Sequence, residues 1–211
     1  MVRTAVLVSG GGTNLQAIID AHAAGEIPDC ELAAVISSNP EAFALKRAEK
    51  AGIPRCVVDV RQYPDRGEFY AAILDKLQEL DIELVVLAGF MYILGPEIIS
   101  QYRNRIINIH PALIPAFSGP GCYGLRVHEM ALAKGVKITG ATVHFVNEGV
   151  DAGPIILQKA VDVRENDTPQ TLQRRVMEEA EWKILPRAIA LYCSGRLKVE
   201  GNIVRIVEVE K

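Results

Sequence analysis

Short apolar segments rich in Val, Ile and Leu alternate with amphipathic segments of helical length along the first half of the chain. We predict strands at Thr4–Val8, Leu32–Ser37, Cys56–Val60, Leu84–Leu87 and Arg105–Ile109. Helices are predicted between them at Asn14–Ala24, Glu41–Ala51, Glu68–Leu80 and Gly95–Tyr102. Strands that are apolar on both faces are typical of parallel sheets covered by helices on both sides. The alternation therefore predicts an α/β fold with a Rossmann-like, doubly wound, mostly parallel sheet.

The second half of the chain has a different pattern, which predicts a mixed C-terminal extension of this sheet. Two longer strands are predicted at Ile138–Val146 and Pro154–Val163, and a terminal hairpin at Leu197–Val199 and Ile203–Val207. Thr168 followed by Pro169 is a typical helix start, and we expect this helix to run to about Ser194. Without a repeat or a linker, the simplest organisation is one domain over residues 1–211.

Composition and charge exclude several classes of protein. Hydrophobic residues make up 49% of the 211 residues, so the chain can bury a core, and the net charge of −3 predicts no nucleic-acid partner. The four cysteines have no paired or metal-ligand spacing, which favours reduced thiols. No apolar run approaches the roughly 18 residues of a membrane span, so we expect a cytoplasmic protein without a membrane partner.

A glycine-rich loop, Ser9–Asn14, follows the first predicted strand and precedes a helix. Glycines let the backbone approach an anion, and the free N–H groups of a helix start favour phosphate. A dinucleotide fingerprint would need glycine at Leu15 and an acidic residue where the second strand ends, and a Walker A loop would need Gly-Lys-Ser/Thr. The loop therefore predicts a site for a single phosphate, with a ligand-free tight turn as the alternative.

A polar pair lies at the carboxyl end of the fifth predicted strand, in the segment Asn-Ile-His-Pro. Alternation along a strand places Asn108 and His110 on one side, at the edge where open α/β sheets bind their ligands. An amide and an imidazole that face the same space can stabilise the oxyanion formed when a nucleophile attacks a carbonyl. Asp151, in a glycine-rich loop, is the carboxylate that could orient the imidazole, but its spacing alone favours an ordinary turn aspartate.

Five segments together resemble a known family. SGGGTN at the start, LAGFM at Leu87–Met91, NIHPALIP at Asn108–Pro115, VHF at Val143–Phe145 and VDAGPIILQ at Val150–Gln158 resemble the phosphoribosylglycinamide formyltransferases of purine biosynthesis. NIHP and the Asp-x-Gly-Pro segment are shared by folate-dependent formyltransferases and hydrolases. The glycine loop and the helix that carries Glu181 are specific to the purine branch.

The resemblance implies a formyltransferase fold with a nucleotide-binding half at 1–110 and a folate-site and C-terminal half at 111–211. It implies Asn108, His110 and Asp151 as catalytic residues, with Asp151 raising the pKa of His110. It implies a substrate site of Gly12, Thr13, Asn14 and Glu181, and a folate site of Arg66, Met91, Tyr92, Ile93, Leu94, Asn108, Asn147, Glu148, Gly149, Val150 and Asp151. The substrates would be glycinamide ribonucleotide and 10-formyltetrahydrofolate, without a metal, and a homodimer stays open.

Three features depart from the family pattern. Tyr92 stands where one branch has arginine, Trp182 replaces a histidine that usually follows the glutamate, and Ala116–Arg126 is longer than in that branch. Four other functions remain as alternatives: a transfer-RNA formyltransferase, a formyltetrahydrofolate hydrolase, a non-catalytic nucleotide-binding module and an NAD oxidoreductase. Chain length and net charge disfavour a transfer-RNA formyltransferase, and length also disfavours a hydrolase. The intact Asn108, His110 and Asp151 disfavour a non-catalytic module, and Leu15 disfavours an NAD oxidoreductase.

Overall fold

A computed structural model describes residues 1–208, which fall into two compact units. Unit 1 comprises Met1–Ile107, and unit 2 begins at Asn108. The division lies inside strand β5 (Ile106–His110), three residues before the boundary between halves that the sequence suggests.

Unit 1 contains a parallel sheet. Its strands are β1 (Val2–Val8), β2 (Cys30–Ser37), β3 (Arg55–Val57) and β4 (Leu84–Leu87), in the order β3-β2-β1-β4. Every pairing among them is parallel, and β4 is buried along its whole length. These pairings confirm the prediction of a mostly parallel α/β sheet. Strands that are apolar on both faces leave no side for water, so helices must cover both sides of the sheet.

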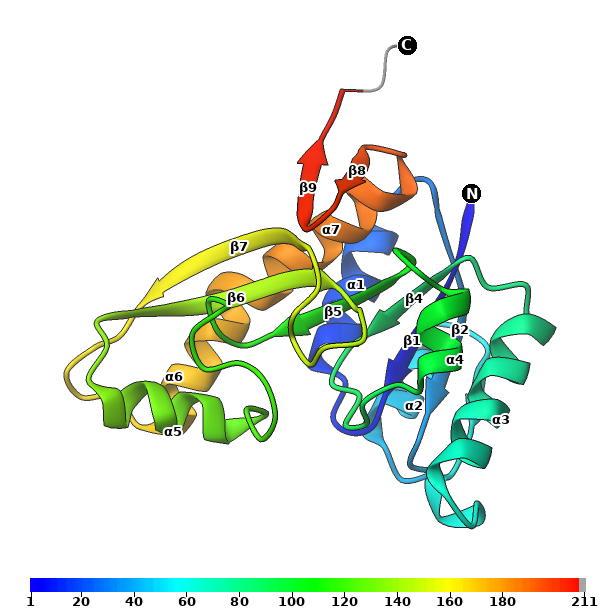
Figure 1. The fold of residues 1–211 in the computed structure, drawn as a ribbon, viewed down its shortest axis with the longest axis horizontal. Coiled ribbons are helices and arrows are strands. Elements are labelled where there is room, and N and C mark those ends of the chain that lie inside the picture. The colour runs from blue at the N-terminus through cyan, green and yellow to red at the C-terminus, as the bar shows by residue number, and fades with distance from the viewer. Residues whose placement is uncertain (209–211) are drawn as a thin grey trace. The chain divides into compact units, whose positions relative to one another are not determined.

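Helices cover both faces of this sheet (Figure 1). They are α1 (Thr13–Ala23), α2 (Phe43–Lys50), α3 (Arg66–Glu79), α4 (Pro96–Gln101) and the 3₁₀ turn η1 (Val60–Gln62). The connections through α1 and α2 lead from β1 to β2 and then to β3, in one direction along the sheet. The connection through α3 leads back past β1 to β4. Because such crossovers are right-handed, α1 and α2 share one face and α3 lies on the other. α4 packs beside α3.

Unit 2 is built on an antiparallel pair of strands, β6 (Ile138–Phe145) and β7 (Ile155–Asp162). The hairpin β8 (Leu197–Glu200) and β9 (Ile203–Ile206) continues this part of the sheet, in the order β6-β7-β9-β8. The helices are α5 (Leu125–Lys134), α6 (Pro169–Val176), the π-helical segment η2 (Met177–Glu181) and α7 (Trp182–Cys193). The orange helices α6 and α7 run along the yellow-green strand β6 and the yellow strand β7 in Figure 1.

Three elements differ from the sequence prediction. The third strand ends at Val57 instead of residue 60, because the Asp59 side chain accepts a hydrogen bond from the Arg61 N–H and starts a 3₁₀ turn. Helix α5 is present although the sequence did not suggest it. The long helix predicted after Thr168 starts where expected, with the Thr168 hydroxyl accepting from the Thr171 N–H, but a π-helical turn interrupts it. Within the described residues no helix has the length and apolarity needed to span a membrane.

Candidate active site

Strand β5 ends in the predicted polar pair of unit 2. His110 is 3% exposed and Asn108 is half-buried, two positions earlier on the same strand face. Pro111 follows, and the chain beyond it is tied to β6: the Thr142 hydroxyl donates to the Ala112 carbonyl at 2.7 Å and accepts from the Ile114 N–H at 3.1 Å. These bonds limit how far the end of β5 can move.

His144, on β6, lies between the predicted catalytic residues. Its Nδ1 is 2.8 Å from the Phe145 carbonyl, which can only accept, so Nδ1 carries a proton. In the neutral ring Nε2 is then an acceptor, and Asn108 Nδ2 donates to it at 3.2 Å. The same Nε2 is 3.7 Å from Asp151 Oδ1. The sequence predicts no role for His144, although VHF (Val143–Phe145) is one of the segments that carry the family resemblance.

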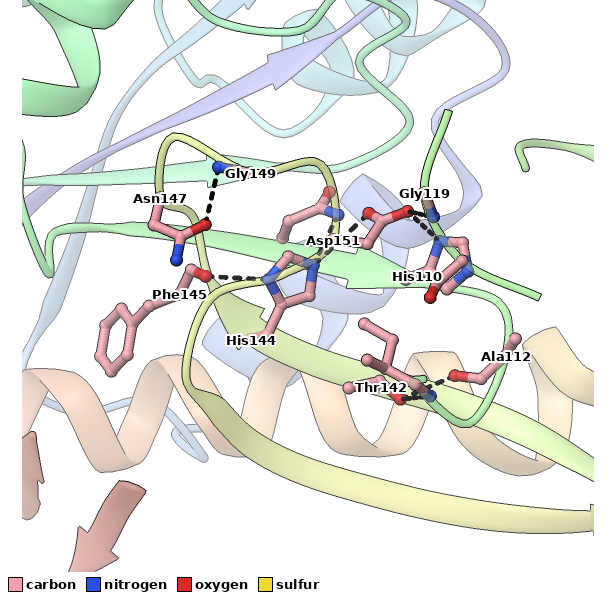
Figure 2. Close-up of polar contacts among 12 residues, drawn as sticks. His110, Ala112, Gly119, Thr142, His144, Phe145, Asn147, Gly149 and Asp151 are labelled. Carbon is pink, nitrogen blue, oxygen red and sulfur yellow. Dashed lines mark hydrogen bonds and ion pairs between the residues drawn. The ribbon is translucent and has the colours of Figure 1, made fainter. Parts of the chain in front are cut away.

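Asp151 lies in the loop between β6 and β7 and points at two imidazoles, as Figure 2 shows. Its Oδ2 is 3.5 Å from His110 Nδ1 and accepts from the Gly119 N–H at 3.0 Å. Its backbone is left-handed, with φ of 53°, a conformation that Asp and Asn tolerate better than other residues. Strained backbone of this kind clusters at functional sites.

Gly153 lets this loop come close to β6. A Cβ at Gly153 would overlap the Phe145 carbonyl oxygen, the atom that also accepts from His144. Phe145 N–H donates to the Pro154 carbonyl at 2.9 Å and closes the loop. A glycine is therefore required here if Asp151 is to reach the histidines.

The segment Ala116–Arg126 supplies two further contacts to the cluster formed by Asn108, His110, His144 and Asp151. His110 Nε2 donates to the Phe117 carbonyl at 2.9 Å, and Gly119 donates to Asp151 as described above. Phe117 has φ of 50°, which is unfavourable for a bulky side chain. Because Nε2 bears the proton in the neutral ring, Nδ1 is the atom of His110 that gains one, and it faces Asp151.

The charges of the cluster follow from burial and from these contacts. Burial alone would raise the pKa of Asp151, but the neighbouring His144 and His110 and the Gly119 N–H together lower it below its ordinary value. Burial lowers the pKa of His110, and the opposing effects of Asp151 and the Phe117 carbonyl do not compensate. Asp151 does favour the charged imidazole, as expected, yet the net shift is downward. At neutral pH the pair is an ionised carboxylate beside a neutral ring.

His128, on α5, is a second buried histidine of unit 2 for which the sequence predicts no role. It has no exposed surface, and neither ring nitrogen has a hydrogen-bond partner within the described residues. Burial, with a smaller effect of His110, lowers its pKa to about 4. His128 is therefore uncharged over the neutral range.

In unit 1, the glycine loop leads from β1 into α1 as predicted. Gly12 immediately precedes the helix and has φ of 72°; a Cβ there would lie 2.7 Å from the Ala44 Cβ on α2. Thr13 and Asn14 form the first residues of α1. Glycine is thus required at position 12 by both conformation and space, and the loop presents backbone rather than side chains.

The predicted folate residues of unit 1 follow β4. The Met91 N–H donates to Ser9 Oγ at 3.0 Å, and the Arg66 guanidinium lies over the Tyr92 ring at 4.4 Å. Met91 and Ile93 are exposed, at 56% and 62%, whereas Leu94 is 5% exposed. Leu94 therefore packs in the core.

The remaining predicted residues belong to unit 2. In the β6–β7 loop, Asn147 Oδ1 accepts from the Gly149 N–H at 3.0 Å, while Glu148 and Gly149 are exposed and Val150 is half-buried. Glu181 is 6% exposed and is the last residue of η2. Pro186 cannot donate to the Trp182 carbonyl, which interrupts regular helical bonding beside this π-helical turn. Single π-helical turns are frequent at functional sites.

Metal-ligating side chains do not gather within residues 1–208: no group of three or more His, Cys, Asp or Glu could hold an ion. The chemistry that the cluster of unit 2 supports is acid–base and electrostatic. It offers a largely buried carboxylate, two imidazoles in defined tautomers and an amide, which suit an oxyanion and a proton transfer at one carbonyl carbon.

Comparison with known proteins agrees with this chemistry. Residues 2–189 match the model of the formyl transferase family. The chain is 41% identical to the phosphoribosylglycinamide formyltransferase of Haemophilus influenzae, over 96% of this chain and 92% of that protein. It is 44% identical to the chicken trifunctional purine biosynthetic protein adenosine-3 over 94% of its length, but spans only 19% of that protein.

A solved structure is similarly close. The crystal structure of glycinamide ribonucleotide transformylase 1 from Symbiobacterium toebii superposes with a TM-score of 0.92 and 48% identity, covering 99% of this chain and 95% of that one. The superposed part of the chain extends across both units.

Proposed function

The chain belongs to the formyl transferase family, and on that premise we propose that it is a phosphoribosylglycinamide formyltransferase. It would transfer the formyl group of 10-formyltetrahydrofolate to the amine of 5′-phosphoribosylglycinamide. The products would be N-formylglycinamide ribonucleotide and tetrahydrofolate, in de novo purine biosynthesis. The observation that carries the proposal is the position of Asp151, whose carboxylate contacts both His110 and His144.

The imidazole of His110 has one nitrogen available for the substrate. Nδ1 faces Asp151, so Nε2–H is the group that donates to the formyl oxygen as negative charge develops there. In this structure the Phe117 carbonyl accepts that proton, and the formyl oxygen would replace it. Asn108 supplies a second donor, with its amide oriented by His144.

The proton balance of the reaction needs one acceptor and one donor. The attacking amine forms a bond to the formyl carbon and loses a proton, and the bond from that carbon to N10 breaks as N10 gains one. Asp151, ionised at neutral pH, would accept the proton directly or through water and return it to N10. Because His110 donates from its neutral form, the burial that lowers its pKa does not impair this role.

Binding of the two substrates rests on the other predicted residues. Gly12, Thr13 and Asn14 would bind the phosphate and ribose through a loop that exposes backbone N–H groups, and Glu181 would bind the ribose hydroxyls. For the folate we propose the exposed Met91 and Ile93, the backbone of Leu94, Tyr92 with Arg66, and the β6–β7 loop from Asn147 to Asp151. The family supports formyl-folate as the co-substrate.

A cytoplasmic location fits the cysteines. Cys30, Cys56, Cys122 and Cys193 form no disulfide within the described part of the chain. Reduced thiols are typical of the reducing compartment in which we propose that the enzyme works.

The test is turnover of purified protein with both substrates, followed by the absorbance of the deformylated folate. Formylated ribonucleotide should accumulate in equal amount. Release of formate without the ribonucleotide would instead indicate a hydrolase. His110→Ala should lower turnover by about 10²–10⁴; turnover within about threefold of wild type would remove His110 from the mechanism.

A further inference from the structure

Helix α2 holds the carbonyl groups of the glycine loop in unit 1. The Ala44 N–H donates to the Gly10 carbonyl at 3.1 Å. One turn later on the same helix, Arg47 Nε donates to the Gly11 carbonyl at 2.9 Å. Two consecutive peptide groups of the loop therefore have their oxygens directed at α2.

The geometry of the peptide bond fixes where the corresponding N–H groups point. In a trans peptide the carbonyl and the following N–H lie on opposite sides. The Gly11 N–H therefore points away from Ala44, and the Gly12 N–H points away from Arg47. Within residues 1–208 neither proton has an acceptor, and Gly11 is exposed. Successive backbone donors with a common direction form an anion-binding concavity.

Besides the Gly11 carbonyl, two side chains hold Arg47 in place. Its NH1 donates to Gln16 Oε1 at 3.0 Å, on the first turn of α1, and its guanidinium lies 5.0 Å from the centre of the Phe43 ring. The Gln16 N–H donates to the Gly12 carbonyl at 2.9 Å, so the helix start and the arginine are joined. With Ala44 filling the space beside Gly12, the loop has little freedom to turn its peptides over.

We propose that Arg47 is a positioning residue for the phosphate of the substrate. It acts through the Gly11 carbonyl, which it binds so that the next N–H faces the anion. The inference rests on the proposed function for the identity of the substrate, but the backbone site and its dependence on Arg47 do not require catalysis. Arg47, a residue outside the loop, would thus maintain the loop conformation that binds a phosphate.

The kinetic test compares two substrates that differ only in the phosphate. Kcat/KM is measured for glycinamide ribonucleotide and for the phosphate-free glycinamide riboside, in wild type, Arg47→Gln and Lys46→Gln. Arg47→Gln should reduce the preference for the phosphorylated substrate by about tenfold, through KM, as expected for the loss of a hydrogen bond that organises a charged contact. Lys46→Gln removes the same charge from the same helix and should leave the preference unchanged.

Two kinetic outcomes would overturn the proposal. An equal loss for both substrates would show that Arg47 only supports the fold. An equal effect of Lys46→Gln would show that the charge of α2, rather than the orientation of the loop, favours the phosphate. If Arg47→Gln does not fold, Arg47→Lys keeps the charge with a single donor head and should show a smaller loss of the same preference; an unchanged preference in Arg47→Lys would count against the proposal.

A binding test separates this inference from the proposed function. Inorganic phosphate is titrated into the full chain while the amide resonances of Gly11 and Gly12 are followed by NMR. Both should shift in wild type and Lys46→Gln, with weaker binding in Arg47→Gln. That result would support Arg47 even if no formyl transfer were found. Absence of a shift in wild type would refute the role of Arg47 even in an active transferase.

Discussion

The two predicted binding regions of this chain are built from different parts of the polypeptide. In unit 1 the glycine loop offers backbone N–H groups, and the side chains that matter, Ala44 and Arg47, stand behind it on α2. In unit 2 the reacting groups are buried side chains, with Asp151 between His110 and His144. The loop binds charge with fixed dipoles, whereas the cluster is arranged to move a proton.

This difference predicts how each region responds to substitution. A backbone site depends on the orientation of its peptide groups and not on its own side chains. It is therefore sensitive to the shape and packing of the neighbouring residues that hold those peptides. A cluster of buried side chains is sensitive to the replacement of a single atom, because every partner loses a contact in a medium of low dielectric constant. Four measurements test this contrast.

Asp151→Asn should have the largest effect. Asparagine has the same shape and tolerates the left-handed backbone, so the fold should persist while the proton acceptor is lost. We expect kcat to fall by about 10²–10⁴ with little change in KM for the ribonucleotide. Asp162→Asn, an exposed change on β7, is the matched control. Retained turnover in Asp151→Asn would place the proton transfer elsewhere.

The buried histidines of unit 2 should make its stability depend on pH. The pKa of His128 is about 4 in the folded chain, below its ordinary 6.5, so the unfolded chain takes up the proton first as pH falls. Its contribution to stability is complete above pH 6.5 and is lost between 6.5 and 4, by about 3 kcal/mol. His110, with a lowered pKa, acts in the same direction.

His128→Leu tests this dependence, because leucine fills the space without the two ring nitrogens that have no partner among the described residues. Urea unfolding at a series of pH values should show a shallower loss of stability in the variant, and hydrogen exchange should locate the change in unit 2. An unaltered slope between pH 6.5 and 4 would assign the effect to other groups.

Gly12→Ala tests the backbone site. The new Cβ would meet Ala44 at 2.7 Å, and φ of 72° is strained for alanine, so the loop must shift. We expect KM for the ribonucleotide to rise at least about tenfold, since displaced donors lose charged hydrogen bonds. Gly25→Ala is the control, because Gly25 has φ of 76° with open space around it. It should lose stability without affecting KM; equal KM effects would mean that backbone strain alone is responsible.

His144→Gln should have the smallest effect of the four. Glutamine can replace one of the contacts that His144 makes with Asn108 and Asp151, but it cannot reproduce the ring bonded to the Phe145 carbonyl. A fall in kcat of about tenfold is expected, the worth of one hydrogen bond. Steady-state kinetics with both substrates would detect it. A loss as large as that of Asp151→Asn would make His144 a member of the reacting group rather than its support.

Local patterns in the sequence were sufficient for most of the fold. The strands of unit 1 were located because each is a continuous apolar run bounded by turn residues, as in Leu84–Leu87. The cap at Thr168 was predicted for the same reason, since it depends on residues within one turn. Helix α5 was missed because its buried face includes His128 beside Val127 and Ala131, so no apolar stripe was visible.

The candidate site divides in the same way. Alternation along one strand sufficed to place Asn108 and His110 together, because it is a property of neighbouring residues. The family resemblance supplied Asp151, and the structure added its distance to His110. Nothing local could indicate that His144 joins Asn108 to Asp151, or that Arg47 binds the Gly11 carbonyl.

The parallel sheet of unit 1, the glycine loop at its edge and the polar pair at the end of β5 could be predicted from the sequence, because each depends on short-range periodicity or on the conformational freedom of glycine. Which groups are charged could not, because charge depends on the tertiary structure. The pKa of His110 reflects burial against Asp151 and the Phe117 carbonyl, and that balance exists only where β5, the β6–β7 loop and the segment after Pro115 come together. Desolvation depends on tertiary packing, which the spacing of residues along the chain does not show.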